Sequence, residues 1–333
     1  MSSIPSSSEP AGTPGTGGPE TGQPPIEAAG IPAAVPAAPA PERDLGVLKL
    51  SSPATREYWE IRVLYEDEHL LAVEKPAGLL TSPDRYDPER PNLMRLLHGH
   101  VARGVPWARE RGISYLANAH RLDFETSGIL LLARTKPALV HLANQFGAEK
   151  PKKTYLAIVD GGPEDDAFEV DARLAPDPVR VGRMRVSHKH GKRSRTEFKV
   201  VTRFAGFTLM EAYPWTGRTH QIRVHLAWVK LPLIGDSLYG GRPLMLSAIK
   251  RGYRKPRNRE EQPLIKRVAL HASVLEVTHP VTGEPVRIEC PLPRDFAVAL
   301  KYLRRFALPG GAGWGNEAAG TEAGGGDDSD GED

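Results

Sequence analysis

The sequence contains a single cysteine, Cys290, and no apolar run that approaches the ~18 residues needed to cross a membrane. One cysteine cannot form an internal disulfide, so a disulfide-stapled secreted domain is excluded. Residues 1–42 contain no lysine or arginine, so they lack the basic start of a signal peptide and the arginines of a mitochondrial presequence. We therefore expect a cytoplasmic protein without a membrane segment.

Both ends of the chain are poor in residues that could build a core. Pro, Ala and Gly account for 24 of residues 1–42, a composition that cannot bury enough apolar area to offset the entropy of ordering. Residues 309–333 are rich in Gly and have seven acidic residues and no basic ones. We expect a disordered arm over residues 1–50, one globular domain over 51–308, and a disordered acidic tail over 309–333.

Charge is distributed unevenly along the chain. Residues 51–308 hold 42 Lys and Arg against 29 Asp and Glu, whereas both ends are acidic. A basic body with acidic ends favours a polyanionic partner such as nucleic acid, although a merely soluble basic surface has the same composition.

The hydrophobic pattern predicts mostly strands with a few separated helices. Short β-favouring runs separated by turns indicate hairpins within 61–73 and 270–290 and strands at 129–133, 154–159, 198–203 and 208–213. Helical spacing indicates helices at 93–101, 135–146 capped by Thr135, 221–229 capped by Thr219, and one carrying Phe296, Leu300 and Leu303 on one face. This order favours an α+β fold with a mixed, mainly antiparallel sheet.

The segment His120-Arg121-Leu122-Asp123-Phe124-Glu125-Thr126-Ser127-Gly128 precedes the apolar run 129–133. Asp123 is thus expected at the edge of the core, partly desolvated and held by local hydrogen bonds. In isolation, the segment equally fits an aspartate that only caps a turn.

A second segment, Gly217-Arg218-Thr219-His220-Gln221-Ile222-Arg223-Val224-His225, is expected to start a helix. Helical spacing places His220, Arg223 and Ala227 on one face and the apolar residues on another. Cations near a helix N-terminus suit a phosphate or a carboxylate, although a solvated helix face explains the pattern as well.

These segments belong to a set of ordered motifs that resembles the RluA-type family of pseudouridine synthases. The matching blocks are Glu74-Lys75-Pro76-Ala77-Gly78-Leu79, His120-Arg121-Leu122-Asp123 with Thr126-Ser127-Gly128, Lys152-Lys153-Thr154-Tyr155-Leu156-Ala157, Gly217 to Arg223, Ile234-Gly235-Asp236 with Tyr239-Gly240, and Leu270-His271-Ala272. They span about 61–306. Six blocks in the same order as in the family are not explained by chance. The resemblance implies the pseudouridine synthase fold for 51–308 and isomerisation of uridine in structured RNA, either large-subunit rRNA or tRNA.

The resemblance also implies roles for individual residues. Asp123 matches the essential catalytic aspartate, and Arg223 matches the arginine that pairs with the aspartate. Tyr155 matches the active-site tyrosine that stacks on the uracil and is the proposed base for removing the carbon-5 proton. Arg121 matches an arginine that fills the space of the flipped nucleotide. Further substrate-binding residues implied by the same motifs are His120, Thr126, Arg218, His220 and Gln221. Lys75 and Pro76 are expected to be structural.

Two basic clusters outside these motifs are candidates for phosphate contacts, which add salt-dependent affinity rather than specificity. Solvated loops would have the same composition. The residues predicted to bind RNA are Arg183, Arg185, Lys189, Lys192, Arg193, Arg195, Lys250, Arg251, Arg254 and Lys255.

Three other interpretations have less support. A catalytically silent RNA-binding or RNA-folding factor could share the fold, but it would be free to lose Asp123, Tyr155 or Arg223. Gly235-Asp236-Ser237-Leu238 spells a short esterase motif, but the Asp-x-x-His that this class needs does not follow it. The histidine pairs His98/His100 and His188/His190 lack nearby cysteines, so no metal site is expected. We expect a monomer that uses no cofactor.

Overall fold

The computed structural model describes residues 45–84, 87–255, 258 and 260–308. The predicted arm up to residue 44 and the acidic tail lie outside the described residues. Within the described part of the chain, none of the helices has the length and hydrophobicity of a membrane span.

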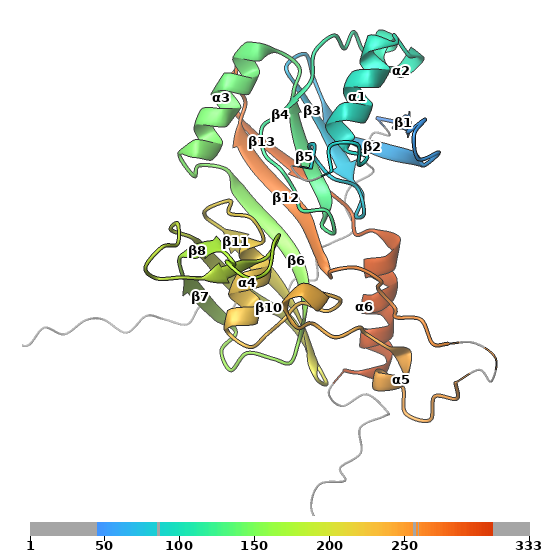
Figure 1. Cartoon of the computed structure of the whole chain (residues 1–333), viewed down its shortest axis with the longest axis vertical. Coiled ribbons are helices and arrows are strands. Elements are labelled where there is room, and N and C mark those ends of the chain that lie inside the picture. The colour runs from blue at the N-terminus through green and yellow to red at the C-terminus, as the bar shows by residue number, and fades with distance from the viewer. Residues whose placement is uncertain (1–44, 85–86, 256–257, 259, 309–333) are drawn as a thin grey trace, which may run out of the picture. The chain divides into compact units, whose positions relative to one another are not determined.

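The main sheet runs in the order β1-β2-β3-β5-β12-β6-β11-β10-β7, with β13 beside β12 and β4 beside β5 (Figure 1). Neighbouring strands are antiparallel except for β12 and β5, which are parallel. A small second sheet consists of β8 and β9. The strands are β1 (Val47–Ser51), β2 (Tyr58–Glu66), β3 (Leu70–Lys75), β4 (Ala117–Asn118), β5 (Ser127–Ala133), β6 (Lys152–Asp160), β7 (Ala167–Asp171), β8 (Leu174–Pro176), β9 (Met184–Val186), β10 (Arg195–Phe204), β11 (Phe207–Pro214), β12 (Leu270–Thr278) and β13 (Pro285–Glu289). The α+β prediction with a mixed, mainly antiparallel sheet is confirmed.

Three helices cover the sheet through buried apolar residues on one face. The helices are α1 (Leu93–Ala102), α2 (Pro106–Glu110), α3 (Lys136–Gly147), α4 (Gln221–Trp228), α5 (Leu246–Ile249) and α6 (Arg294–Phe306), with a 3₁₀ turn η1 (Ser237–Tyr239). Leu93 and Leu97 of α1 pack on β1–β3, and Leu142 of α3 packs on β5 and β12. The apolar face of α6 that contains Phe296 and Leu300 packs beside β10 and β11.

Three local predictions at helix and domain ends have different outcomes. The Thr135 hydroxyl accepts a hydrogen bond from the Ala138 amide, which confirms it as the N-cap of α3. Thr219 does not cap α4, because the N-cap is His220 in a left-handed conformation (φ 54°) without a side-chain cap. The globular domain also begins before residue 51, because β1 pairs with β2 and buries Leu48 and Leu50 completely.

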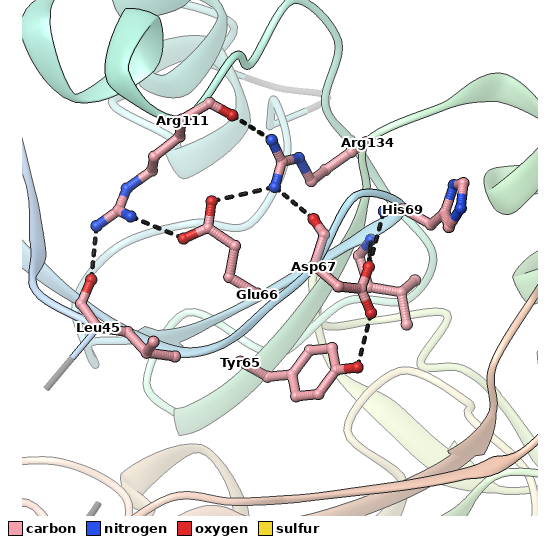
Figure 2. Close-up of polar contacts among 8 residues, drawn as sticks. Leu45, Tyr65, Glu66, Asp67, His69, Arg111 and Arg134 are labelled. Atoms are coloured by element: carbon pink, nitrogen blue, oxygen red, sulfur yellow. Dashed lines mark hydrogen bonds and ion pairs between the residues drawn. The ribbon is translucent and has the colours of Figure 1, made fainter. Parts of the chain in front are cut away.

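A cluster of ion pairs joins three segments that are far apart in the sequence (Figure 2). Glu66, at the end of β2, binds Arg111 beyond α2 at 2.7 Å and Arg134 after β5 at 3.0 Å. Arg134 also donates to the carbonyl oxygens of Asp67 and Arg111, and Arg111 donates to the Leu45 carbonyl at 2.6 Å. These contacts fix the β2–β3 turn against α2 and the end of β5.

Candidate active site

A cleft of about 310 Å³ lies between the loop that precedes β5, the start of β6, and the start of α4. It contains the three residues predicted to be catalytic, Asp123, Tyr155 and Arg223. Of the predicted substrate-binding residues, all except His220 line this cleft: His120, Arg121, Thr126, Arg218 and Gln221. The fold therefore brings residues more than 100 positions apart in the sequence to one place.

The Thr-Ser-Gly turn after Asp123 is shaped by the parallel pairing of β5 with β12. Gly128 has a φ of +119°, and a Cβ there would lie 2.2 Å from the Ala272 carbonyl oxygen. The Ser127 hydroxyl lies 2.9 Å from Nδ1 of the buried His271, whose Nε2 lies 3.3 Å from the Cys290 carbonyl oxygen. Each of these contacts holds the end of the Asp123 loop against the sheet.

Thr126 differs from its neighbours because its hydroxyl is buried and has no hydrogen-bond partner among the described residues. It lines the cleft with Asp123. A buried hydroxyl without a partner costs free energy unless a ligand supplies the hydrogen bond. The position therefore suits a contact with substrate.

The buried His271 makes the free energy of unfolding depend on pH. Burial lowers the pKa of His271 to about 4, below the value of about 6.5 in an unfolded chain. The unfolded chain therefore binds the proton first, and we expect the free energy of unfolding to fall as the pH drops from about 6.5 toward 4. One such histidine contributes at most about 1.4 kcal/mol per pH unit.

Urea unfolding of the wild type and of His271→Gln at several pH values measures this contribution. In the variant, the slope of the unfolding free energy against pH should fall by the amount that corresponds to one titrating group. The contributions of the other groups cancel in the comparison. Equal slopes for the two proteins would show that His271 is not buried as a neutral group.

Arg223 lies inside the protein with an exposed fraction of only 3%. Its guanidinium binds Asp236 through two hydrogen bonds of 2.7 and 2.8 Å, and it binds Glu125 at 3.1 Å. Burial alone would lower the pKa of Arg223, but the bonds with Asp236 and the nearby charges raise it. Arg223 is therefore a permanently charged group in the wall of the cleft.

This geometry corrects two expectations about Arg223. The helix face with His220 and Ala227 was expected to present Arg223 as a cation available to a phosphate or a carboxylate. In the structure, its charge is already paired within the protein. Among the described residues, the hydrogen-bond and ion-pair partners of Arg223 are Asp236 and Glu125, whereas Asp123 acts on it through its charge alone. Sequence reasoning missed Asp236, although it belongs to the Ile234-Gly235-Asp236 block.

His220 lies outside the lining of the cleft and contacts Tyr239. Its Nδ1 is 2.8 Å from the Tyr239 hydroxyl, which also accepts a hydrogen bond from the Met184 amide at 2.9 Å. The Tyr239 ring also lies beside Arg223, with 5.1 Å from the guanidinium carbon to the ring centre. Burial lowers the pKa of His220, which favours a neutral imidazole.

Tyr155 is held on β6 between Ala212 of β11 and Ala272 of β12. Burial and the negative charge of Asp123 raise the pKa of its phenol. At neutral pH, Tyr155 is therefore a protonated hydroxyl. No residue described in the structure forms a hydrogen bond with this hydroxyl, so it is available to a substrate in the cleft.

Two predicted substrate contacts are used within the protein. Nε2 of His120 accepts a hydrogen bond from the Leu131 amide at 2.9 Å, and burial lowers the pKa of His120 to about 3. The Gln221 carboxamide accepts from Thr216 at 2.5 Å and from the Arg218 amide at 3.0 Å. It also donates to the Arg195 carbonyl at 2.9 Å and to Thr196 at 3.0 Å, which uses its full hydrogen-bonding capacity. Gln221 thus positions the loop before α4 in place of contacting substrate.

The loop around Asp123 is also held from the segment after β3. The Gly78 amide donates to the Phe124 carbonyl at 2.8 Å, and the Thr81 hydroxyl donates to the Leu122 carbonyl at 2.9 Å. Lys75 is fully buried and donates to the carbonyls of Pro76 and Leu79. Burial lowers the pKa of Lys75 to about 7, although the charge of Asp123 opposes this. These contacts agree with a structural role for the Lys-Pro motif.

The basic clusters divide into exposed and paired residues. Arg195 binds Glu169 at 2.6 Å and Glu197 at 3.2 Å and lies over the Trp215 ring, so two carboxylates share its charge in the free protein. Its phosphate contact stays a prediction. Arg183 is partly buried 3.7 Å from Asp177. The remaining predicted RNA-binding residues are exposed: Arg185, Lys189, Lys192, Arg193, Lys250, Arg251, Arg254 and Lys255.

Comparison with known proteins places this site in a family. A family model described as RNA pseudouridylate synthase matches residues 69–228. Ribosomal large subunit pseudouridine synthase D of Xylella fastidiosa is 38% identical over 255 residues, which cover 73% of this chain and 69% of that protein. The uncharacterized RNA pseudouridine synthase YlyB of Bacillus subtilis is 34% identical over 251 residues, which cover 75% of each chain.

A solved structure shares the fold. Human RNA Pseudouridylate Synthase Domain Containing 4 superimposes with a TM-score of 0.54 at 24% identity, covering 73% of this chain and 92% of that one. At this identity the likeness shows the fold alone.

The chain belongs to the RNA pseudouridylate synthase family. It is an RNA pseudouridine synthase, an isomerase, and the predicted family, fold and enzyme class are confirmed. The esterase interpretation is wrong, because Asp236 is committed to Arg223 and Ser237 is an exposed residue of η1. The interpretation as a silent RNA-binding factor has no support from these relatives.

Proposed function

We propose that this synthase isomerises uridine in large-subunit ribosomal RNA, with Asp123 as the catalytic carboxylate. The choice of large-subunit rRNA as the substrate is supported by the relatives named ribosomal large subunit pseudouridine synthase D. They are 34–38% identical over about three quarters of the chain. The alternative substrate within the family resemblance is tRNA.

The reaction breaks the C–N bond between uracil and ribose, rotates the base, and joins it again through carbon 5. When carbon 5 joins the ribose it releases its proton, and N1 of the uracil takes up a proton, so the product is an isomer of uridine. No electron is transferred, so acid–base groups and a carboxylate are sufficient. Asp123 starts the reaction by attacking the sugar, by adding to the base or by removing the 2′ proton. The cleft is compatible with all three routes.

A fixed positive charge acts on Asp123. The buried, permanently charged Arg223 interacts with the Asp123 carboxylate through its charge. Since Arg223 is itself held by Asp236, it cannot collapse onto Asp123 and block it. The Thr126 hydroxyl and the Tyr155 ring are the groups we assign to binding the uracil.

The uridine must leave its stack to reach this cleft, which costs a few kcal/mol and is offset by contacts in the pocket. Arg121 and Arg218 are exposed at the lining of the cleft and are the cations we assign to the flanking RNA. The exposed basic residues outside the cleft add affinity that falls with salt.

Replacing Tyr155 by Phe tests the hydroxyl alone, because the ring and its packing remain. We expect the single-turnover rate to fall by about 10²-fold, in the range of general acid–base catalysis, with little change in RNA affinity. An unchanged rate would remove the hydroxyl from the mechanism and leave Tyr155 a stacking role only.

Tritium release from RNA labelled at carbon 5 of uracil identifies the substrate. Large-subunit rRNA, small-subunit rRNA and tRNA are assayed separately with the full chain. We expect release from large-subunit rRNA alone. Release from tRNA alone would overturn the proposed substrate while leaving the reaction in place.

A further inference from the structure

The most exposed large hydrophobic residues of the described chain lie outside the active-site cleft. Val179 and Val181 are 85% and 79% exposed, and both lie in the loop between β8 and β9. Exposed apolar side chains that gather on one loop indicate a contact surface. We refer to residues 173–193 as the β8–β9 arm and to residues 177–183 as its tip.

The tip is held in one conformation by its own hydrogen bonds. The Asp177 carboxylate accepts from the amides of Val179 at 2.9 Å and Arg180 at 3.2 Å. The Asp177 amide donates to the Arg183 carbonyl at 2.8 Å, and the Arg183 amide donates to the Arg180 carbonyl at 3.1 Å. Contact through such a preorganised loop costs little conformational entropy.

The charge around the two valines fits a nucleic acid. The β8–β9 arm contains seven basic residues and one acidic residue, Asp177. Arg180 and Arg185 are exposed on either side of Val181. A second copy of this chain would present the same positive charge and be repelled, whereas phosphates would be attracted.

The base of the arm packs on the helix that carries the catalytic arginine. Leu174 forms a buried cluster with Val224 of α4 and with Tyr239. The Met184 amide donates to the Tyr239 hydroxyl, and the Tyr239 ring lies beside Arg223. Figure 1 shows β8 beside α4. An RNA that occupies the cleft is thus adjacent to the arm.

We propose that the tip of the β8–β9 arm contacts bases of the substrate RNA through Val179 and Val181, while its arginines contact phosphates. Apolar side chains of nucleic-acid-binding proteins insert between base steps and stabilise an unstacked conformation. A base-contacting tip of this kind would select RNAs with unstacked nucleotides near the target uridine. The inference rests on the proposed function insofar as the bound RNA is the substrate.

The test compares Val179→Ser/Val181→Ser with Val281→Ser, which changes a valine that is 63% exposed in the β12–β13 turn. The wild type is first assayed for tritium release to find the RNA that reacts, and Kd is then measured for that RNA. We expect the double variant to raise Kd by about tenfold, the size of one lost base contact, with an unchanged Tm. The Val281→Ser control should match the wild type.

The salt dependence separates the valines from the arginines. Removing apolar groups releases no counterions, so the slope of log Kd against log salt should stay the same in the double valine variant. Arg180→Gln/Arg185→Gln should instead lower that slope by about 2.

A Kd for the double valine variant equal to that of the wild type would overturn the proposal. So would a change in sedimentation without a change in Kd, which would assign the tip to contact between copies of the chain. Reaction of the wild type with tRNA alone would overturn the proposed substrate and leave the test of the tip intact, because Kd is measured with the RNA that reacts.

Discussion

Asp123→Asn is expected to abolish turnover while RNA binding survives. Asn has nearly the same size as Asp, so the loop held by Gly78 and Thr81 on either side of it should remain in place. The amide can neither attack as a nucleophile nor accept a proton as a base. We expect the single-turnover rate to fall by at least about 10⁴-fold, which corresponds to about 5 kcal/mol of transition-state stabilisation.

The control for this variant is RNA affinity and thermal unfolding of the same preparation. An RNA Kd and a Tm close to those of the wild type would assign the loss to chemistry. Turnover at a substantial fraction of the wild-type rate would show that another group starts the reaction.

Arg223→Gln is expected to impair both stability and catalysis. It leaves Asp236, whose side chain is only 1% exposed, without its charged partner. Removing one member of a buried ion pair typically costs about 3–5 kcal/mol, so the free energy of unfolding should fall by that amount. The single-turnover rate should fall by about 10²–10³-fold, because the fixed positive charge beside Asp123 is lost.

A second variant separates these two effects. Arg223→Gln/Asp236→Asn replaces both charges by neutral groups that can bond to each other, so most of the stability should return while the rate remains low. If the double variant regained the rate as well, Arg223 would have a structural role only. Urea unfolding and single-turnover assays on both variants measure the outcome.

The sequence predicted most of the longer strands and the four longest helices, and the fold places the predicted site residues Asp123, Tyr155 and Arg223 in one cleft. The short elements β4, β8, β9, α2 and α5, and also β7, were not predicted. The apolar spacing in α1 and α6 predicts the buried faces correctly, because local periodicity and burial coincide there. The ordered motifs point to Asp123 and Tyr155, because each of these residues lies within a short segment that resembles the family. β1 was missed because its alternating pattern covers only five residues directly after the Pro-rich segment.

The partners of charged side chains could not be predicted. Arg195 lies among cations in the sequence, but Glu169 on the neighbouring strand β7 forms an ion pair with it. Arg223 was expected to pair with Asp123, but the fold places Asp236 closer through the turn before η1. Such choices depend on which strands and loops become neighbours, and this information is not local. Gln221 illustrates the same point, because its four hydrogen bonds connect α4 to β10 and to the loop after β11.

We expect this cleft to isomerise uridine in RNA without releasing the base. The direct measurement is the nucleoside composition of labelled large-subunit rRNA after complete reaction and digestion, together with the tritium released. One pseudouridine should form for each tritium released, and no free uracil should appear. Free uracil without pseudouridine would show that the cleft hydrolyses the glycosidic bond and that the protein is not an isomerase.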